Sequence, residues 1–151
     1  MTQLKRILLA EDNEHDVELT LSALAESRLA NEVVVVRDGA EALEYLYRRG
    51  RYQQREEANP VVVLLDLKMP KVDGLEVLRR IKQDDALRQI PVVMLTSSRE
   101  ENDLVESYRL GVNAYVVKPV EFSRFVQAVR ELGVFWAVIN EAPPGSAGKS
   151  P

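Results

Sequence analysis

The sequence predicts an α/β protein with a doubly wound, five-stranded parallel sheet and helices on both faces. Short apolar runs rich in Val, Ile and Leu alternate with segments whose apolar residues recur at helical spacing. This strict alternation is typical of parallel strands joined by right-handed helical crossovers. The runs are nearly continuous in apolar residues, as expected of strands that are buried on both sides.

Three apolar runs in the first half of the chain are expected to be strands, because they are short and β-branched or aliphatic. They are residues 4–10, 33–36 and 61–65. Two helices are expected between them, over residues 14–25 and 40–47, where apolar side chains share one helical face. The polar segment from Arg48 to Pro60 is expected to be a solvated loop or a frayed helix end, including Arg51 and Arg55.

The second half continues the alternation with strands over residues 91–95 and 114–117. The three remaining helices are one opened by Asp73-Gly74, one over residues 99–110 and one from Glu121 onwards. The helical period continues past Gly133, so an extension of the fifth helix through residue 139 stays open, although Gly disfavours helix by ~1 kcal/mol against Ala. Residues 1–141 are therefore expected to form one domain, and 142–151, rich in Pro, Gly, Ser and Ala, a disordered tail.

The bulk composition narrows the class of protein. The chain has 151 residues, 46% hydrophobic and 29% charged, which is ordinary for one globular domain. A net charge of −4 argues against nucleic acid as the main partner. The absence of cysteine excludes disulfides and thiol chemistry and fits a cytoplasmic protein. No apolar stretch reaches the ~18 residues of a membrane span, and no secretory signal precedes the first acids.

Polar residues stand at the ends of four expected strands. Glu11 and Asp12 follow the first, Asp66 the third and Lys118 the fifth, while the fourth is followed by Thr96. An ionised carboxylate such as that of Asp66 is costly at the end of a buried strand unless something pairs with it. Ligands of doubly wound sheets bind at the carboxyl ends of the strands, so these side chains are expected to share one site.

Three carboxylates in one small site repel one another, and a divalent cation removes the conflict. Mg²⁺ prefers oxygen ligands and is usually held by one or two carboxylates together with a phosphate. We expect Asp12 and Asp66 to be direct ligands, and Glu11 to act through water. The backbone carbonyl of Lys68 would complete the protein ligands.

The same residues are suited to phosphoryl transfer. Asp66 can act as the nucleophile and form an aspartyl-phosphate. The charge on the transferred group would be neutralised by the cation, the Thr96 hydroxyl and the Lys118 ammonium. Because Pro119 follows Lys118, the peptide bond between them is one where the cis form is affordable.

The motifs resemble the receiver domain of two-component response regulators over about residues 4 to 132. The matching positions are Glu11-Asp12, Asp66 within LLDLKMPKVDG, Thr96-Ser97 and Lys118-Pro119. The resemblance implies a flavodoxin-like strand order 2-1-3-4-5 and a phosphoryl group that Asp66 accepts from a phosphohistidine of a sensor histidine kinase. It also implies that Thr96 and Tyr115 switch position on phosphorylation and change a partner-binding face; the alternative for Tyr115 is a half-buried strand aromatic.

A finer resemblance is to the small regulators that accompany bacterial phytochromes. It rests on the EDNxxD opening, which ends at Asp16, on the long charged segment before the third strand, and on the Phe135-Trp136 pair. Such regulators tend to be homodimers, which makes Phe135, Trp136 and Ile139 candidate interface residues; the alternative is that they cover the chain's own core. Since no output domain follows the fifth helix, a stand-alone receiver is expected.

Two other classes of function compete with this interpretation. A receiver fold could serve as a binding module that works without phosphorylation, but the loss of an acid or of Lys118 that would favour it is not seen. A Mg²⁺-dependent phosphatase of the haloacid dehalogenase type would place a second Asp two residues after the nucleophile. That position is Lys68, so we expect no enzyme activity beyond the chain's own phosphotransfer and dephosphorylation.

Overall fold

The computed structural model describes residues 5–25, 31–56, 58–96 and 101–133. They form a parallel sheet in the order β2-β1-β3-β4-β5, which confirms the predicted doubly wound fold and its strand order. The strands are β1 (Lys5–Ala10), β2 (Asn31–Val36), β3 (Val62–Asp66), β4 (Val92–Thr96) and β5 (Ala114–Val117). The sequence placed β3 and β4 one residue too early, because it assigned Asp66 and Thr96 to the loops that follow.

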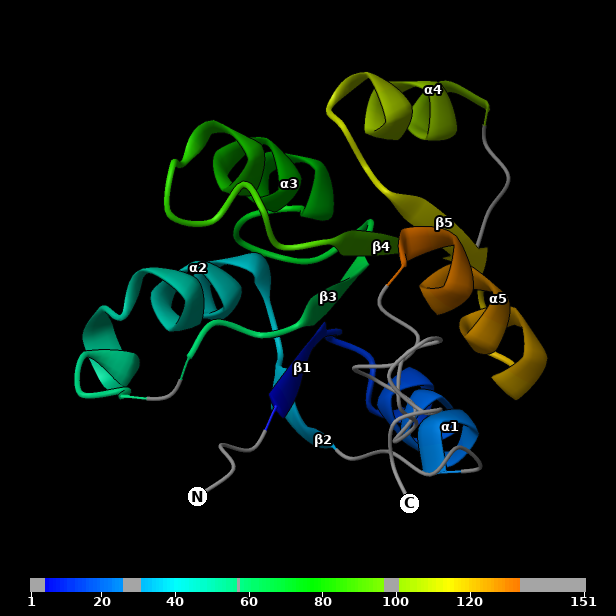
Figure 1. Ribbon diagram of the computed structural model, residues 1–151, viewed down its shortest axis with the longest axis horizontal. Helices are drawn as coiled ribbons and strands as arrows, with labels where there is room; N and C mark the ends of the chain where they lie inside the picture. The colour runs from blue at the N-terminus through cyan, green and yellow to red at the C-terminus, as the bar shows by residue number, and fades with distance from the viewer. Residues whose placement is uncertain (1–4, 26–30, 57, 97–100, 134–151) are drawn as a thin grey trace, which may run out of the picture.

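Five helices cover the two faces of this sheet (Figure 1). They are α1 (Glu14–Ala25), α2 (Gly39–Tyr47), α3 (Gly74–Gln83), α4 (Glu101–Arg109) and α5 (Phe122–Leu132). Helices α2, α3 and α4 lie on one face, and α1 and α5 lie on the other. No helix among the described residues is both long and apolar enough to cross a membrane.

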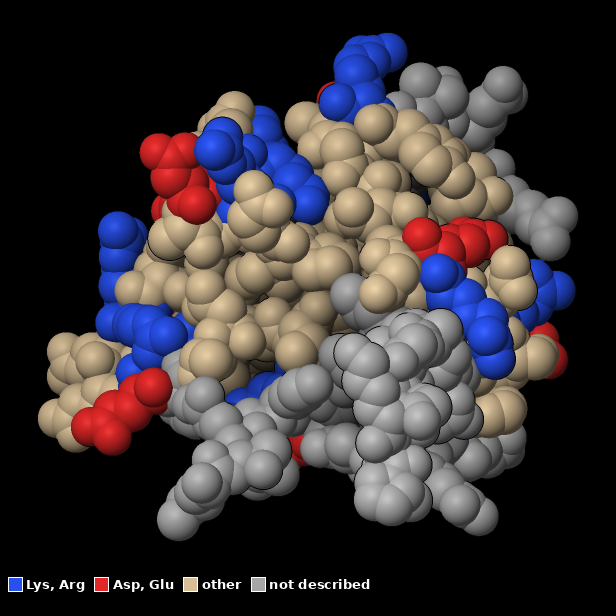
Figure 2. All heavy atoms as spheres, viewed as in Figure 1, with Lys and Arg blue, Asp and Glu red and all other residues tan. Residues whose placement is uncertain are grey.

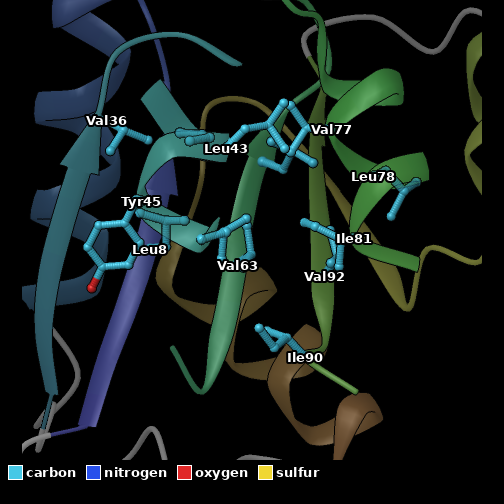
Figure 3. Packing of buried hydrophobic residues seen from close by; sticks show 14 of the residues in the cluster. Leu8, Val36, Leu43, Tyr45, Val63, Val77, Leu78, Ile81, Ile90 and Val92 are labelled. Carbon is cyan, nitrogen blue, oxygen red and sulfur yellow. The ribbon is translucent and has the colours of Figure 1, made fainter. Parts of the chain in front are cut away.

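Alternate residues of the central strands supply two separate hydrophobic cores. Leu8 and Val63 point toward α2 and α3 (Figure 3), whereas Ile7 and Leu64 point toward α1 and α5. All four side chains are fully buried. Because both faces are covered, β3 and β4 carry no polar residue until their carboxyl ends, where Asp66 and Thr96 stand.

Two helices begin with the same Asp-x-x-Glu arrangement. Asp38 caps α2 and accepts a hydrogen bond from the backbone N–H of Glu41 at 2.7 Å. Asp73 caps α3 and accepts one from the N–H of Glu76 at 2.9 Å. Caps of this kind are worth about 1 kcal/mol each, and here they fix the start of both helices beside the loops at the carboxyl edge of the sheet.

The fifth helix ends where the sequence left an extension open. Gly133 is in the left-handed conformation, with φ 75°, and its N–H points at the carbonyls of Arg130 and Val129. This is a helix C-terminus that glycine favours, and the described part of α5 ends at Leu132. The extension through residue 139 that the sequence left open falls outside the described residues. The candidate interface residues 135, 136 and 139 and the expected tail 142–151 lie outside the described residues.

The charged segment before β3 is more ordered than a solvated loop. A short 3₁₀ helix, η1, covers Gly50–Tyr52, and Arg55 is 8% exposed. The Arg55 guanidinium donates to the carbonyls of Tyr45 and Ala58 at 2.9 and 3.1 Å and lies over the Tyr45 ring. The expectation for Arg55 was therefore wrong, because a planar cation can be buried when carbonyls and an aromatic ring surround it.

Charged side chains of both signs lie interspersed around the rim of the face drawn in Figure 2. Among the described residues on this face, lysines and arginines do not gather into one continuous basic surface. This distribution agrees with the small net charge of −4.

Candidate functional site at the carboxyl edge of the sheet

The sheet register brings the predicted site residues together. Ala10 pairs with Leu65, so Glu11 and Asp66 come next on neighbouring strands. On the other side of β3, the backbone N–H of Lys118 donates to the Thr96 carbonyl at 2.7 Å. These residues line one cavity of about 220 Å³. Its full lining is Glu11, Asp12, Asn13, Asp16, Asp66, Leu67, Lys68, Thr96 and Lys118.

Lys118 is the cation at the centre of this cavity. Its Nζ lies 2.8 Å from Glu11 Oε1, 3.0 Å from Asp16 Oδ2 and 3.2 Å from Asp66 Oδ1. Burial disfavours the ammonium, but the hydrogen bonds to Glu11 and Asp16 and the charge of Asp66 outweigh it, so the pKa of Lys118 lies above its usual value. Lys118 therefore stays charged at any physiological pH.

The surroundings of Asp66 disfavour the ionised form of its carboxyl group. It is only 5% exposed. Burial, and next the charge of Glu11, raise the pKa of Asp66 to about 7 in spite of the nearby Lys118. One ammonium does not balance the carboxylates around it, and a second positive charge would restore the ionised form of Asp66.

The site fits a hard divalent cation. One carboxylate oxygen from each of Glu11, Asp12 and Asp66 lies within 4.8 Å of the others. Asp12 is exposed and Glu11 is fully buried, so the cluster reaches from the core to solvent. The backbone at Lys68 lines the same cavity. A donor set made only of oxygens, open on one side for water, is the kind that Mg²⁺ or Mn²⁺ takes.

The loop that carries Lys68 is held by two glycines. A Cβ on Gly74 would lie 2.2 Å from the Asp66 carbonyl oxygen, and one on Gly39 would lie 1.8 Å from that of Val72. The same loop turns sharply at Lys71, which has φ 68°, and the N–H of Val72 donates to the Pro70 carbonyl at 2.8 Å. Close packing against the start of α2 therefore shapes this turn.

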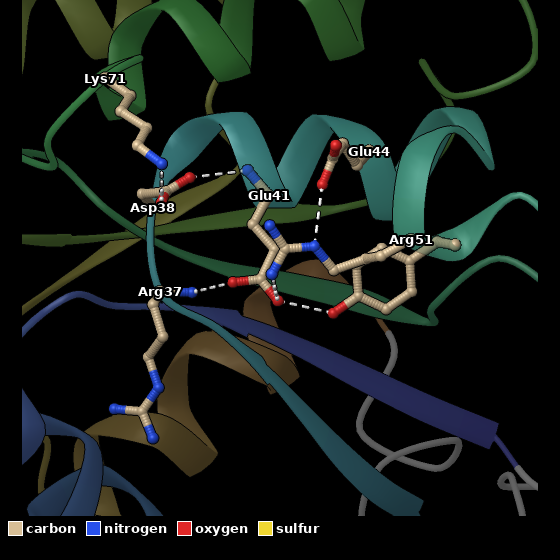
Figure 4. Close-up of polar contacts among 7 residues, drawn as sticks. Arg37, Asp38, Glu41, Glu44, Arg51 and Lys71 are labelled. Carbon is tan, nitrogen blue, oxygen red and sulfur yellow. Dashed lines mark hydrogen bonds and ion pairs between the residues drawn. The ribbon is translucent and has the colours of Figure 1, made fainter.

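The end of β2 also contributes, although sequence reasoning found no chemistry there. Asp38 lies 3.5 Å from the Lys71 ammonium, and Glu41 accepts the backbone N–H of Arg37 at 2.9 Å (Figure 4). The Arg37 guanidinium also pairs with Glu14 at the start of α1. The Arg37-Asp38 pair thus ties the end of β2 to loops on both sides of the cavity. Nothing in the local sequence signals this role, because both partners are distant along the chain.

The proposed switch residues lie on the α4–β5–α5 side of the molecule. Thr96 is 2% exposed at the end of β4, whereas Tyr115 on β5 is 38% exposed. The Tyr115 ring meets that of Tyr108 edge-to-face, with centroids 5.7 Å apart. Both tyrosines line a groove of about 600 Å³ with residues of β5 and α5. The Lys118-Pro119 peptide bond is cis, and Ser97 lies outside the described residues.

A sheet in this order, with acids after β1 and at the end of β3, a hydroxyl at the end of β4 and a lysine after β5, defines a receiver-type α/β protein. The chain belongs to the response regulator receiver domain family, whose model matches residues 7–130.

Similar proteins are known from sequence and from structure. Response regulator Rcp1 of Synechocystis sp. is 40% identical over 132 residues, which cover 87% of this chain and 88% of Rcp1. Its Mn²⁺-bound structure has a TM-score of 0.73, at 40% identity, over 88% of this chain and 94% of that one. The bacteriophytochrome response regulator RtBRR is 65% identical, with a TM-score of 0.83, over 97% of this chain and 88% of RtBRR. Phosphorylated RcpA, a cyanobacterial phytochrome response regulator, is 46% identical, with a TM-score of 0.74, over 88% of this chain and 94% of that one.

Proposed function

We propose that this protein is a phosphorylation-controlled receiver, in which Asp66 accepts a phosphoryl group from the phosphohistidine of a sensor histidine kinase. The observation that carries this proposal is the placement of the Asp66 carboxylate at the carboxyl edge of the sheet. It lies 3.2 Å from the Lys118 ammonium and within 4.8 Å of two further acids. The phosphorylated structure of RcpA supports it by likeness.

In the transfer, an oxygen of Asp66 forms a bond to phosphorus as the bond from phosphorus to the imidazole nitrogen breaks. The phosphohistidine reacts with a proton on its other ring nitrogen, so the imidazole leaves with the electron pair of the broken bond as a neutral ring. We expect the Lys118 ammonium and the Thr96 hydroxyl to stabilise the charged oxygens of the transferred group. Lys68 stands two residues after Asp66, where a phosphatase of the haloacid dehalogenase type would need a second acid.

The cation of the site is proposed to be Mg²⁺, held by Asp12, Asp66 and the Lys68 carbonyl, with Glu11 acting through water. When bound, it would neutralise the charge that accumulates on the phosphoryl oxygens. The Mn²⁺-bound form of Rcp1 supports the binding of a divalent cation by this chain.

The kinase partner is proposed to carry a phytochrome-like sensor, because RtBRR is a bacteriophytochrome response regulator and RcpA is a phytochrome response regulator. We also propose that the protein acts in the cytoplasm as a homodimer, and that phosphorylation moves Thr96 and Tyr115 and so alters the groove between β5 and α5. The exposed Tyr108–Tyr115 pair supports this, because an edge-to-face contact at the surface can be rearranged without opening the core.

The test is incubation with acetyl phosphate and Mg²⁺ followed by intact mass measurement. We expect one phosphoryl group on the wild type and none on Asp66→Asn, with the added mass lost in base. An equal mass gain on Asp66→Asn, or no gain on the wild type, would contradict the proposal. Light scattering of the same samples reports whether the protein is a dimer and whether phosphorylation changes that state.

A further inference from the structure

The Lys118 ammonium hydrogen-bonds to two carboxylates and forms an ion pair with a third. Its partners are Glu11 at 2.8 Å, Asp16 at 3.0 Å and Asp66 at 3.2 Å. An ammonium has only three donors. The donor nearest Asp66 can turn to an oxygen of a phosphoryl group on that residue. A second donor becomes available to the phosphoryl group only after Glu11 or Asp16 gives way.

The three partners differ in how easily they can give way. Glu11 is fully buried, and its other oxygen accepts the backbone N–H of Asn13 at 3.1 Å, so it would be left as an unpaired buried charge. Asp66 is itself the phosphoryl acceptor. Asp16 lies in the first turn of α1 with a side chain that is 28% exposed, so water can replace Lys118 around its carboxylate. Asp16 is therefore the partner that is released with the smallest penalty.

We propose that Asp16 is a positioning residue that competes with the phosphoryl group for Lys118 and so sets how tightly the phosphorylated state is held. The proposal rests on the phosphoryl-accepting function of Asp66 described above. Without the Asp16 charge, Lys118 keeps one donor ready for a phosphoryl oxygen. The site also loses a negative charge that repels the phosphoryl group and attracts the cation.

Removing the Asp16 charge should therefore strengthen the binding of a phosphoryl mimic and weaken the binding of a divalent cation, and both affinities can be measured. In Asp16→Asn, we expect Mn²⁺ to bind about twofold more weakly, because one nearby negative charge is gone. We expect beryllofluoride, a mimic of the phosphoryl group, to bind about threefold to fivefold more tightly at saturating Mg²⁺. That is the size of change expected from a partly exposed ion pair. Calorimetric titrations measure both affinities.

The matched control is Glu18→Gln, which removes the same charge from an exposed position two residues further along α1. We expect neither affinity to change in this control. Asp16→Ser, whose side chain is too short to reach Lys118, is expected to behave like Asp16→Asn. Urea unfolding of both variants checks that they are folded.

Weaker binding of both ligands by Asp16→Asn would mean that Asp16 supports Lys118 rather than competes for it, and would overturn the proposal. Equal shifts in Glu18→Gln would overturn it too, because they would reflect general charge. If the wild type binds both ligands and Asp16→Asn leaves the beryllofluoride affinity unchanged, this inference alone is wrong. If the wild type binds neither ligand, the proposed function fails and the inference fails with it.

Discussion

At the scale of single residues, Asp66 shows how function shapes the energetics of this site. Its folded-state pKa of about 7 lies above the ordinary value, so the native protein keeps a proton that the unfolded chain has lost. Between about pH 4 and pH 7, the native state therefore binds more protons than the unfolded state. The metal-free protein must lose stability as the pH rises through this window, and the penalty is complete above pH 7.

The first prediction follows from this loss of stability with rising pH. Asp66→Asn is never charged, so in EDTA it should be more stable than the wild type at pH 8, and nearly equal to it at pH 4. The rise in the Asp66 pKa corresponds to about 4 kcal/mol of lost stability at most. The buried amide of the variant offsets part of this, so we expect the free energy of unfolding to increase by about 1–3 kcal/mol at pH 8. Urea unfolding at both pH values measures the difference.

The control for this prediction is Asp85→Asn, because the Asp85 side chain is 95% exposed. It should change the unfolding free energy by less than about 0.5 kcal/mol at either pH. A loss of stability in Asp66→Asn at pH 8 would show that the pair with Lys118 outweighs the burial of the carboxylate.

The second residue-scale prediction concerns Arg55, the cation that the sequence assigned to solvent. Arg55→Met would leave the carbonyls of Tyr45 and Ala58 without this donor, and we expect a loss of about 2–4 kcal/mol. Arg88→Met is the control, since that side chain is 57% exposed and should cost less than about 0.5 kcal/mol. Urea midpoints compare the two, and equal losses would contradict a structural role for Arg55.

At the scale of elements, the start of α2 acts as a template for the loop that follows β3. Asp38 caps the helix and faces Lys71, and Gly39 lets the Val72 carbonyl approach closely (Figure 4). The loop also carries the Lys68 carbonyl of the proposed cation site. The geometry of that site therefore depends on a helix that supplies none of its ligands.

The third prediction tests this dependence. In Gly39→Ala, the new Cβ would lie 1.8 Å from the Val72 carbonyl oxygen, so the loop must move. We expect Mn²⁺ affinity to fall by about tenfold, within the range for changes to groups that orient metal ligands. Alanine favours helix by ~1 kcal/mol over glycine, so the weaker binding would not arise from a melted α2. Calorimetry measures the affinity, and circular dichroism checks the helix.

Gly133→Ala provides the comparison, because nothing lies within 4 Å of the Cβ it would add. Its φ of 75° makes that substitution costly for stability at the end of α5, while the cation site is left untouched. Unchanged metal affinity in Gly39→Ala, or an equal loss in Gly133→Ala, would argue against the template role of α2.

At the scale of the whole molecule, the proposed cation site would couple to stability, because its ligands would come from the loop after β1, from β3 and from the loop after β3. A cation that binds the folded chain alone must stabilise it by mass action. The fourth prediction is that Mg²⁺ at ten times its dissociation constant raises the unfolding free energy by about 1.4 kcal/mol. Thermal melts with increasing Mg²⁺ should show a rising midpoint that EDTA reverses.

Asp12→Asn should abolish most of that rise, since Asp12 is an exposed member of the acid cluster. NaCl at equal ionic strength separates specific binding from charge screening. A midpoint that rises equally with NaCl would mean that the acids are screened rather than bridged by a cation.

The sequence predicted most of this architecture because its signals are local. Apolar periodicity marks strands and helices, and acids such as Asp66 stand visibly where an apolar run ends. The errors came where distant partners decide the outcome. Arg55 is buried because its guanidinium donates to the Tyr45 carbonyl and lies over the Tyr45 ring, both supplied by α2.

By itself, then, the sequence determined the order of elements, the family and the residues of the proposed phosphoryl-accepting site, because each of these depends on contiguous stretches of chain. Only the tertiary structure decided how those residues share their charges. Lys118 and Glu11 are 107 residues apart, yet the sheet register brings their side chains to 2.8 Å, with Asp16 as the third partner. Such contacts depend on how neighbouring strands and loops pack, and no local pattern in the chain records that.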